Sequence, residues 1–306
     1  MQFAILRLRR KIIADFPQQA IHNTVSKNNE QTMRTSILII LCLVNFSIFG
    51  QNTVDGKIKN AQTNEPIPYV NIGILKRDKG TVSNEKGEFS LEIPTEFIND
   101  TIKISSIGYK TKIFIVKEFI KTLNENPSIE LSENVIELNE VVVSSKKLKE
   151  KVLGNKTKSR MMRGGFRNAE LGNELGIKIK IKKSPTYITK FHANVTSNTG
   201  EKMKFRLNFY NIEKGLPKEK LIQQNIVFGI DTKEGAFTLD LSKYNIVVKD
   251  DFYLTMELIE NQGKKENEVF FSAGLLGNAT VTRLTSQAEW KKLGSIGIGF
   301  SLTTEY

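Results

Sequence analysis

Four aromatic side chains are the residues of this sequence best suited to hold a ligand. Trp290 lies in a polar stretch, residues 287–292, where an indole ring is expected to be exposed, and Tyr187, Tyr210 and Tyr253 stand in or beside strand-like segments. Aromatic rings present a large apolar face and, in Trp and Tyr, a polar tip, a combination that suits the stacking of sugar rings. We therefore predict these four side chains as candidate ligand-stacking positions, with ordinary packing in a core or at its rim as the alternative.

The sequence lacks the residue patterns of the common catalytic sites. It contains no G-x-S-x-G nucleophile elbow, no G-x-x-x-x-G-K phosphate loop and no H-E-x-x-H zinc motif. Its only cysteine, Cys42, lies in an apolar run near the N-terminus, and Asp250 and Asp251, as neighbours on a strand, would point to opposite faces. His192 stands in a strand-like stretch, where a surface or half-buried histidine is expected rather than a ligand. We predict no catalytic residue, no metal site and no cofactor, and hence a protein that is not an enzyme.

Composition and charge restrict the class of protein further. The 306 residues include 39% hydrophobic and 25% charged residues, close to the globular average, which excludes a disordered chain and a polytopic membrane protein. The chain is long enough for two hydrophobic cores. Its formal charge of +12 includes a lysine-dense stretch at residues 144–158, but this stretch has no interleaved aromatic residues, so nucleic acid is not an expected partner.

The first 50 residues have the pattern of an N-terminal extension followed by a secretory signal. Met33 and Arg34 precede an apolar run at residues 37–49, and Gly50 ends it. As a helix this run would be about 20 Å long, too short for a hydrocarbon layer of about 30 Å. We predict an exported protein, periplasmic or associated with the outer membrane, with a true start at Met33; a basic amphipathic helix at residues 6–13 is the alternative.

Residues 51–133 show the short alternations and regularly spaced turns of a β-sandwich. In residues 69–74, Tyr69, Asn71 and Gly73 interleave with three β-branched residues, as on a strand with two different faces. Turn residues separate such strands, because glycine supplies positive φ and asparagine bonds its own backbone. The predicted turn positions are Gly56, Asn84, Gly87, Gly108 and Tyr109.

Four segments of this region, residues 54–58, 66–72, 80–91 and 104–110, together resemble the carboxypeptidase regulatory-like domain. The resemblance covers residues about 52–133 and implies a seven-stranded prealbumin-like sandwich, as found at the N-terminus of TonB-dependent outer-membrane receptors that take up glycans. It does not imply peptidase activity here, because a metallocarboxypeptidase needs a histidine-containing zinc site and His192 is the only histidine after the signal.

We assign residues 134–172 to a polar linker and residues 173–306 to a second sandwich of jelly-roll type. Strict alternation returns beyond Gly172, for example at residues 177–181, 205–209, 237–241 and 254–258. Residues 237–253 loosely resemble carbohydrate-module-like jelly-roll domains.

The sequence thus predicts an all-β, exported, non-enzymatic envelope adaptor or binding module. Its ligand is an envelope protein or a glycan, association with the outer membrane stays open, and the oligomeric state is unknown. Two alternatives remain. Residues 296–306 place their apolar side chains on one parity, as the last strand of a small outer-membrane β-barrel protein would, and an accessory role beside a cell-envelope hydrolase is also compatible.

Overall fold

The computed structural model describes residues 51–134, 148–200, 202–262, 267–275 and 279–306. The predicted signal and N-terminal extension, residues 1–50, lie outside the described residues. Strands dominate the described part of the chain, which confirms the all-β class. Within it, no helix is long and apolar enough to cross a membrane.

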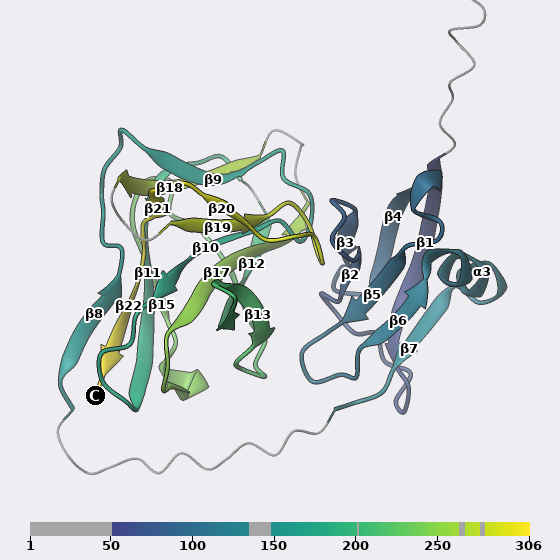
Figure 1. The fold of residues 1–306 in the computed structure, drawn as a ribbon, viewed down its shortest axis with the longest axis horizontal. Coiled ribbons are helices and arrows are strands. Elements are labelled where there is room, and N and C mark those ends of the chain that lie inside the picture. The colour runs from purple at the N-terminus through teal and green to yellow at the C-terminus, as the bar shows by residue number, and fades with distance from the viewer. Residues whose placement is uncertain (1–50, 135–147, 201, 263–266, 276–278) are drawn as a thin grey trace, which may run out of the picture. The chain divides into compact units, whose positions relative to one another are not determined.

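The first sandwich consists of two small sheets that enclose an apolar core (Figure 1). One sheet has the order β4-β1-β7 and the other the order β3-β2-β5-β6. Strand β7 runs parallel to β1, and the other pairings are antiparallel. The seven strands described here agree with the predicted seven-stranded sandwich; they are β1 (Gln51–Asn60), β2 (Asn71–Ile74), β3 (Gly80–Val82), β4 (Glu88–Pro94), β5 (Thr101–Ser105), β6 (Lys112–Ile115) and β7 (Ser128–Leu131).

A helix that the alternation did not predict, α3 (Val116–Glu125), completes this core. Its buried residues Val116, Phe119 and Leu123 recur at intervals of three and four, which is the spacing of one helical face. The Phe119 ring stacks on Phe89 of β4 with 6.2 Å between the ring centroids. The helix therefore packs beside β1, β5 and β6 and adds its apolar face to this core (Figure 1).

The second sandwich consists of a seven-stranded and an eight-stranded sheet. The seven-stranded sheet has the order β13-β12-β17-β10-β19-β20, with β14 also paired to β12. The other has the order β21-β18-β11-β22-β8, with β15 and β16 paired to β11 and β9 paired to β18. The strands are β8 (Glu150–Gly154), β9 (Arg163–Arg167), β10 (Glu174–Ile179), β11 (Thr186–Asn198), β12 (Met203–Glu213), β13 (Leu216–Lys220), β14 (Ile226–Gly229), β15 (Gly235–Asp240), β16 (Ile246–Val248), β17 (Phe252–Asn261), β18 (Glu268–Leu275), β19 (Thr280–Arg283), β20 (Lys291–Leu293), β21 (Ile296–Ile298) and β22 (Phe300–Glu305).

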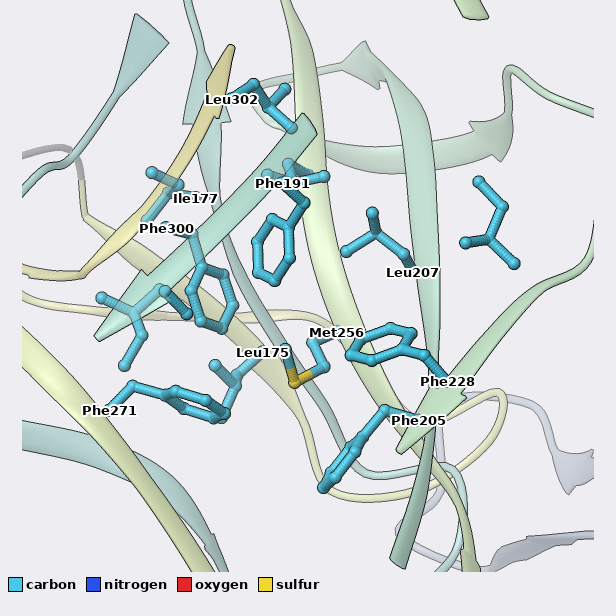
Figure 2. Close-up of a cluster of buried hydrophobic side chains, with 14 of the residues drawn as sticks. Leu175, Ile177, Phe191, Phe205, Leu207, Phe228, Met256, Phe271, Phe300 and Leu302 are labelled. Atoms are coloured by element: carbon cyan, nitrogen blue, oxygen red, sulfur yellow. The ribbon is translucent and has the colours of Figure 1, made fainter. Parts of the chain in front are cut away.

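Large aromatic and aliphatic side chains from both sheets fill the space between them, as Figure 2 shows. Phe300 of β22 packs edge-on against Phe191 and Phe271, at centroid distances of 5.2 and 5.3 Å. Leu207 of β12 and Met256 of β17 enter the same core from the seven-stranded sheet. Burial of such side chains contributes roughly 1.5–3 kcal/mol each, so a sandwich without disulfides is held together by this core.

The residues predicted as a linker contain two strands of the second sandwich, so the boundary at residue 172 is wrong. Strand β8 pairs with the C-terminal strand β22, and β9 pairs with β18. Leu153 and Phe166 anchor these strands in the core, at 7% and 1% exposure. Each of these two strands has only one buried residue, and the charged residues and glycines around it do not form an alternating pattern.

The predicted turn positions have mixed outcomes. Asn84 Oδ1 accepts hydrogen bonds from the backbone N–H groups of Lys86 and Glu88, both at 2.9 Å, and Gly87 closes this turn at φ +73°. Gly108 also has positive φ, +82°, and Tyr109 follows it in an isolated bridge to Glu133.

Gly56 is not a turn residue but lies inside strand β1. A Cβ at Gly56 would stand 2.7 Å from the Phe89 ring and 2.8 Å from Leu123. The glycine therefore makes room for the core rather than for a change of chain direction.

Candidate functional site

Four charged side chains form a row across four neighbouring strands of the seven-stranded sheet, on the face turned away from its core. In register, Arg283 of β19 lies opposite Glu174 of β10, Glu174 lies opposite Glu257 of β17, and Glu257 lies opposite Arg206 of β12. All four are buried, with exposures between 0% and 8%. We call these residues the charge row. Because side chains alternate along a strand, a slip of one residue would send these charges into the apolar core.

Glu257 and Arg206 form the central ion pair of the charge row. Arg206 Nε donates to Glu257 Oε2 at 3.0 Å, and Arg206 Nη2 lies 2.9 Å from the same oxygen as part of the ion pair. Asn208 donates to the same oxygen at 2.8 Å. Burial alone would raise the pKa of Glu257, but the surrounding cations, with Arg206 first, together hold it below its usual value, so the carboxylate stays ionised.

Glu174 and Arg283 form the second ion pair. Arg283 Nε donates to Glu174 Oε2 at 2.9 Å, Arg283 Nη2 lies 2.6 Å from the same oxygen, and the Tyr210 hydroxyl donates to that oxygen at 3.3 Å. Asn208 donates to Glu174 Oε1 at 2.8 Å, and Thr255 donates to that oxygen too. The two carboxylates thus share Asn208 as a donor.

The first sandwich completes the charge row from the opposite side. Arg206 Nη1 donates to the backbone carbonyl of Tyr69 at 2.8 Å, and its Nη2 donates to the side chain of Asn71. Asn71 in turn donates to Glu257, and to the Ser286 hydroxyl at 2.9 Å. Tyr69 and Asn71 belong to the polar face of the two-faced stretch that the sequence predicted, and this face is covered by protein rather than by water.

Two glycines allow the backbones to approach closely at this contact. A Cβ on Gly73 would stand 2.1 Å from the Ser286 carbonyl oxygen, and one on Gly80 would stand 2.5 Å from the same atom. Next to them, Gln287 donates from its side-chain amide to the Ser105 hydroxyl at 3.0 Å. The loop at residues 285–287 is therefore packed directly on strands β2, β3 and β5.

A cavity of about 490 Å³ opens beside the charge row, and residues of both sandwiches line it. Its walls carry side-chain amides and hydroxyls, the basic groups described next, one carboxylate and two tyrosines. The lining residues are Asn71, Lys103, Ser105, Ser106, Ile107, Tyr109, Thr111 and Asn134 from the first sandwich, and Tyr210, Lys218, Glu219, Lys220, Gln223, Arg283 and Gln287 from the second. A volume of this size is in the range of small-molecule sites.

Two lysines of the cavity are affected by burial. Burial, with the Arg206 guanidinium as the next cause, lowers the pKa of Lys220 to about 7 against the opposing effect of Glu257 and Glu174. Burial also lowers the pKa of Lys103, with the Arg283 guanidinium as the next cause. The charged forms of these two lysines are therefore destabilised by loss of contact with water in the cavity.

The four aromatic candidates are not gathered in one ligand-stacking surface. Tyr210 and Tyr253 are buried at 4% exposure, because each is packed between neighbouring side chains of the sheet face. Trp290 is half-buried, with Arg283 over its ring at 4.8 Å and the Tyr210 ring edge-on at 5.6 Å. Tyr187 is half-buried on β11, in the other sheet of the second sandwich. Only Tyr210 lines the cavity.

The described residues contain no cluster of three or more His, Cys, Asp or Glu side chains that could hold a metal ion. His192 is half-buried and hydrogen-bonded to the hydroxyls of Thr238 and Thr303, at 2.9 and 2.7 Å. Burial, followed by the charge of Lys190, lowers the pKa of His192. Its ring nitrogens are thus occupied by strand neighbours.

The alternating pattern did not predict the residues that matter most in this site. Arg206, Glu174, Glu257 and Arg283 lie at the polar positions of alternating strands, which a period-two pattern assigns to solvent. A signal was present in the position of each charge along its strand, because opposite charges at matching positions of neighbouring strands pair across a sheet. That signal can be used only once the strand order is known.

Of the comparisons with known proteins, a family model supports the assignment of the first sandwich. Comparison with curated proteins finds no match. Among solved structures, the cysteine protease and lectin-like domains of Cwp84, a surface layer associated protein of Clostridium difficile, are similar at 8% identity and a TM-score of 0.37, over 74% of this chain and 45% of that chain. The same clostridial protease after propeptide cleavage is similar at 9% identity and a TM-score of 0.37, over 84% of this chain and 66% of that chain.

A structure of infectious bursal disease virus, Gx strain, is similar at 9% identity and a TM-score of 0.27, over 83% of this chain and 63% of that chain. This chain therefore spans less than two thirds of the length of each of these proteins. Residues 54–143 match the family model of the CarboxypepD_reg-like domain.

Proposed function

We propose that the protein is a non-catalytic binding module of the cell envelope, with its ligand in the cavity between the two sandwiches. The family assignment of residues 54–143 supports a regulatory or binding type of domain. The observation that carries the proposal is the cavity itself, since both sandwiches supply hydrogen-bonding groups to one space of about 490 Å³. A ligand there would contact Ser105 and Lys103 on one side and Tyr210 and Gln287 on the other.

The chemistry of the cavity supports binding rather than catalysis. Its one carboxylate, Glu219, has no second carboxylate among the lining residues to form the acid and base pair of a glycosidase. The two carboxylates of the charge row, Glu174 and Glu257, are held by arginine and asparagine donors. Carboxylates whose oxygens are already taken up by such donors hold structure rather than act on a ligand.

The ligand is a glycan or an envelope protein, and one experiment separates the two. The full chain is applied to an array of bacterial envelope glycans and, in parallel, cross-linked in an envelope extract. Binding to glycans that Gly73→Val abolishes would support a saccharide site formed by both sandwiches. Specific cross-links without glycan binding would support a protein ligand. The absence of both glycan binding and specific cross-links would contradict the function as a binding module.

Export is part of this proposal and has its own test. Residues 33–50 have the order of a charged, apolar and small-residue segment. Mass spectrometry of the protein from fractionated cells is expected to give an N-terminus near Gln51 and recovery with the envelope. A cytoplasmic protein that retains residues 2–32 would contradict export.

A further inference from the structure

The cavity carries more positive charge than the protein neutralises. Four cations line it, Lys103, Lys218, Lys220 and Arg283, against the single carboxylate of Glu219. Arg283 is committed to Glu174, and Lys218 lies 3.4 Å from Glu213, a second carboxylate. The remaining two cations, Lys103 and Lys220, are not paired in this way with a carboxylate that the structure describes.

Lys103 and Lys220 have no hydrogen bond or ion pair with any described residue at their ammonium groups. They come from different sandwiches, Lys103 from β5 and Lys220 from the end of β13. Both are half-buried. An ammonium group withdrawn from water without a partner costs free energy, and such groups either lose their proton or acquire an anion. The lowered pKa values of both lysines agree with a site whose counter-charge is missing.

The remaining lining groups indicate what else the anion carries. Ser105, Gln287 and Gln223 offer hydroxyl and amide groups around the two lysines, and the Tyr210 hydroxyl lies at the inner wall. Such groups both donate and accept, as the hydroxyls of a sugar require. A cavity of about 490 Å³ accommodates a small molecule or the end of an oligosaccharide rather than a folded partner.

On the basis of the proposed function, we infer that the cavity binds an acidic saccharide, whose carboxylate, phosphate or sulfate group is held between Lys103 and Lys220. The acid lies between the two ammonium groups and joins the two sandwiches. The sugar hydroxyls are held by Ser105, Gln287 and Gln223. Glu174 of the charge row holds Arg283 and Tyr210 in place. Its carboxylate and that of Glu257 do not line the cavity, so they do not repel the acid at close range.

Isothermal titration calorimetry on the full chain tests this with matched sugars. Galacturonate is compared with galactose, and glucose 6-phosphate and glucose 6-sulfate with glucose. At least one acid is expected to bind about tenfold or more tightly than its neutral partner, since a charge-assisted hydrogen bond contributes roughly 1.5–3 kcal/mol. Which acid binds best identifies the anionic group.

Variants assign the effect to the two lysines. Lys103→Met and Lys220→Met are each expected to weaken binding of the acid about tenfold or more and to leave any binding of the neutral sugar unchanged. Lys117→Met, at an exposed position on α3, is the matched control and should bind like the wild type. Circular dichroism melting curves establish that each variant is folded, and removal of an unpaired ammonium group is not expected to lower the midpoint.

The outcomes separate this inference from the proposed function. Equal binding of acidic and neutral sugars, or lysine variants that bind the acid like the control, would overturn the acidic ligand and leave the binding module standing. The absence of all saccharide binding together with a cross-linked envelope protein would overturn the inference alone. The absence of any ligand in both experiments would overturn both.

Discussion

Glu174 and Glu257 lie directly opposite each other on neighbouring strands, an arrangement that like charges normally avoid. The charge row makes it stable, because Arg283 and Arg206 flank the two carboxylates and Asn208 donates to both. Ion pairs of this kind are costly to bury and costlier to break, since a partner left alone is an uncompensated charge. At the scale of single residues, the contact between the sandwiches is therefore specific where the charge row meets Asn71, because the charges there are paired.

The central ion pair gives the first stability prediction. Arg206→Met is expected to lower the free energy of unfolding by roughly 3–5 kcal/mol, because Glu257 keeps its charge and loses its main partner. The measurement is urea unfolding followed by circular dichroism. Arg77→Met is the control, because Arg77 pairs with Asp100 at 2.8 Å with a half-exposed side chain and should cost at most about 1 kcal/mol. Similar losses in the two variants would refute the distinction.

Lys220 gives a prediction about pH. Its pKa of about 7 in the folded chain lies below the ordinary 10.5, so between these values the unfolded chain binds more protons and stability rises with pH. Below about pH 7 the lysine is charged in both states and its destabilising effect is complete. The charged groups that face it are Arg206 of β12, Glu257 of β17, Glu174 of β10 and Arg283 of β19.

Lys220→Met is expected to remove this rise and to be more stable than the wild type at pH 7. The free energy of unfolding is measured at several values from pH 7 to 10, with Lys117→Met as the control. A wild-type slope that survives in Lys220→Met would show that another group is responsible.

At the scale of strands and helices, alternation was a good guide to which elements exist and a poor guide to what covers them. Strand β2 shows both sides of this: Ile72 enters the core as predicted, while Asn71 and Gly73 meet the second sandwich rather than water. Polar side chains suit water and a polar protein surface equally, so the pattern cannot distinguish them. Helix α3 was missed because Val116 directly follows the apolar residues of β6, so the two elements form one continuous apolar run.

Strand β2 also gives a prediction about the contact between the sandwiches. Gly73→Ala would bring a methyl group against the Ser286 carbonyl oxygen and is expected to cost about 1–3 kcal/mol, as overpacking does. Gly229→Ala is the matched control, because the nearest atom to its Cβ would be the Met203 carbonyl oxygen at 3.8 Å. Urea unfolding compares the two. A Gly73→Ala protein as stable as Gly229→Ala would mean that the loop at residues 285–287 moves aside freely.

At the scale of the whole molecule, the sequence predicted two cores and a connection, but not that the two cores are joined by buried charges. The two sandwiches were predicted from their alternation, and the core residues of each come from its own strands. The site lies where they meet, and its residues come from β2, β5, β10, β12, β13, β17 and β19. Pairings between distant parts of a chain leave no local pattern, which is why the fold was largely foreseen and the site was not.

The shared contact predicts how the molecule unfolds. Differential scanning calorimetry is expected to show one transition for the wild type, because Asn71 is bonded to Arg206, Glu257 and Ser286 of the other sandwich. Asn71→Ala is expected to split it into two transitions. Asn84→Ala, which removes an exposed turn bond of the same sandwich, should lower the midpoint and keep one transition. Two transitions in the wild type would show that the sandwiches unfold independently.

The position of the single tryptophan has a practical consequence. Trp290 lies against Arg283 and Tyr210, and both of these residues line the cavity. Indole emission depends on the polarity and charge around the ring, so ultraviolet excitation of the unlabelled protein reads out this one place without background from other indoles. The molecule therefore carries its own optical sensor at the wall of the cavity, and ligand screening needs no attached dye.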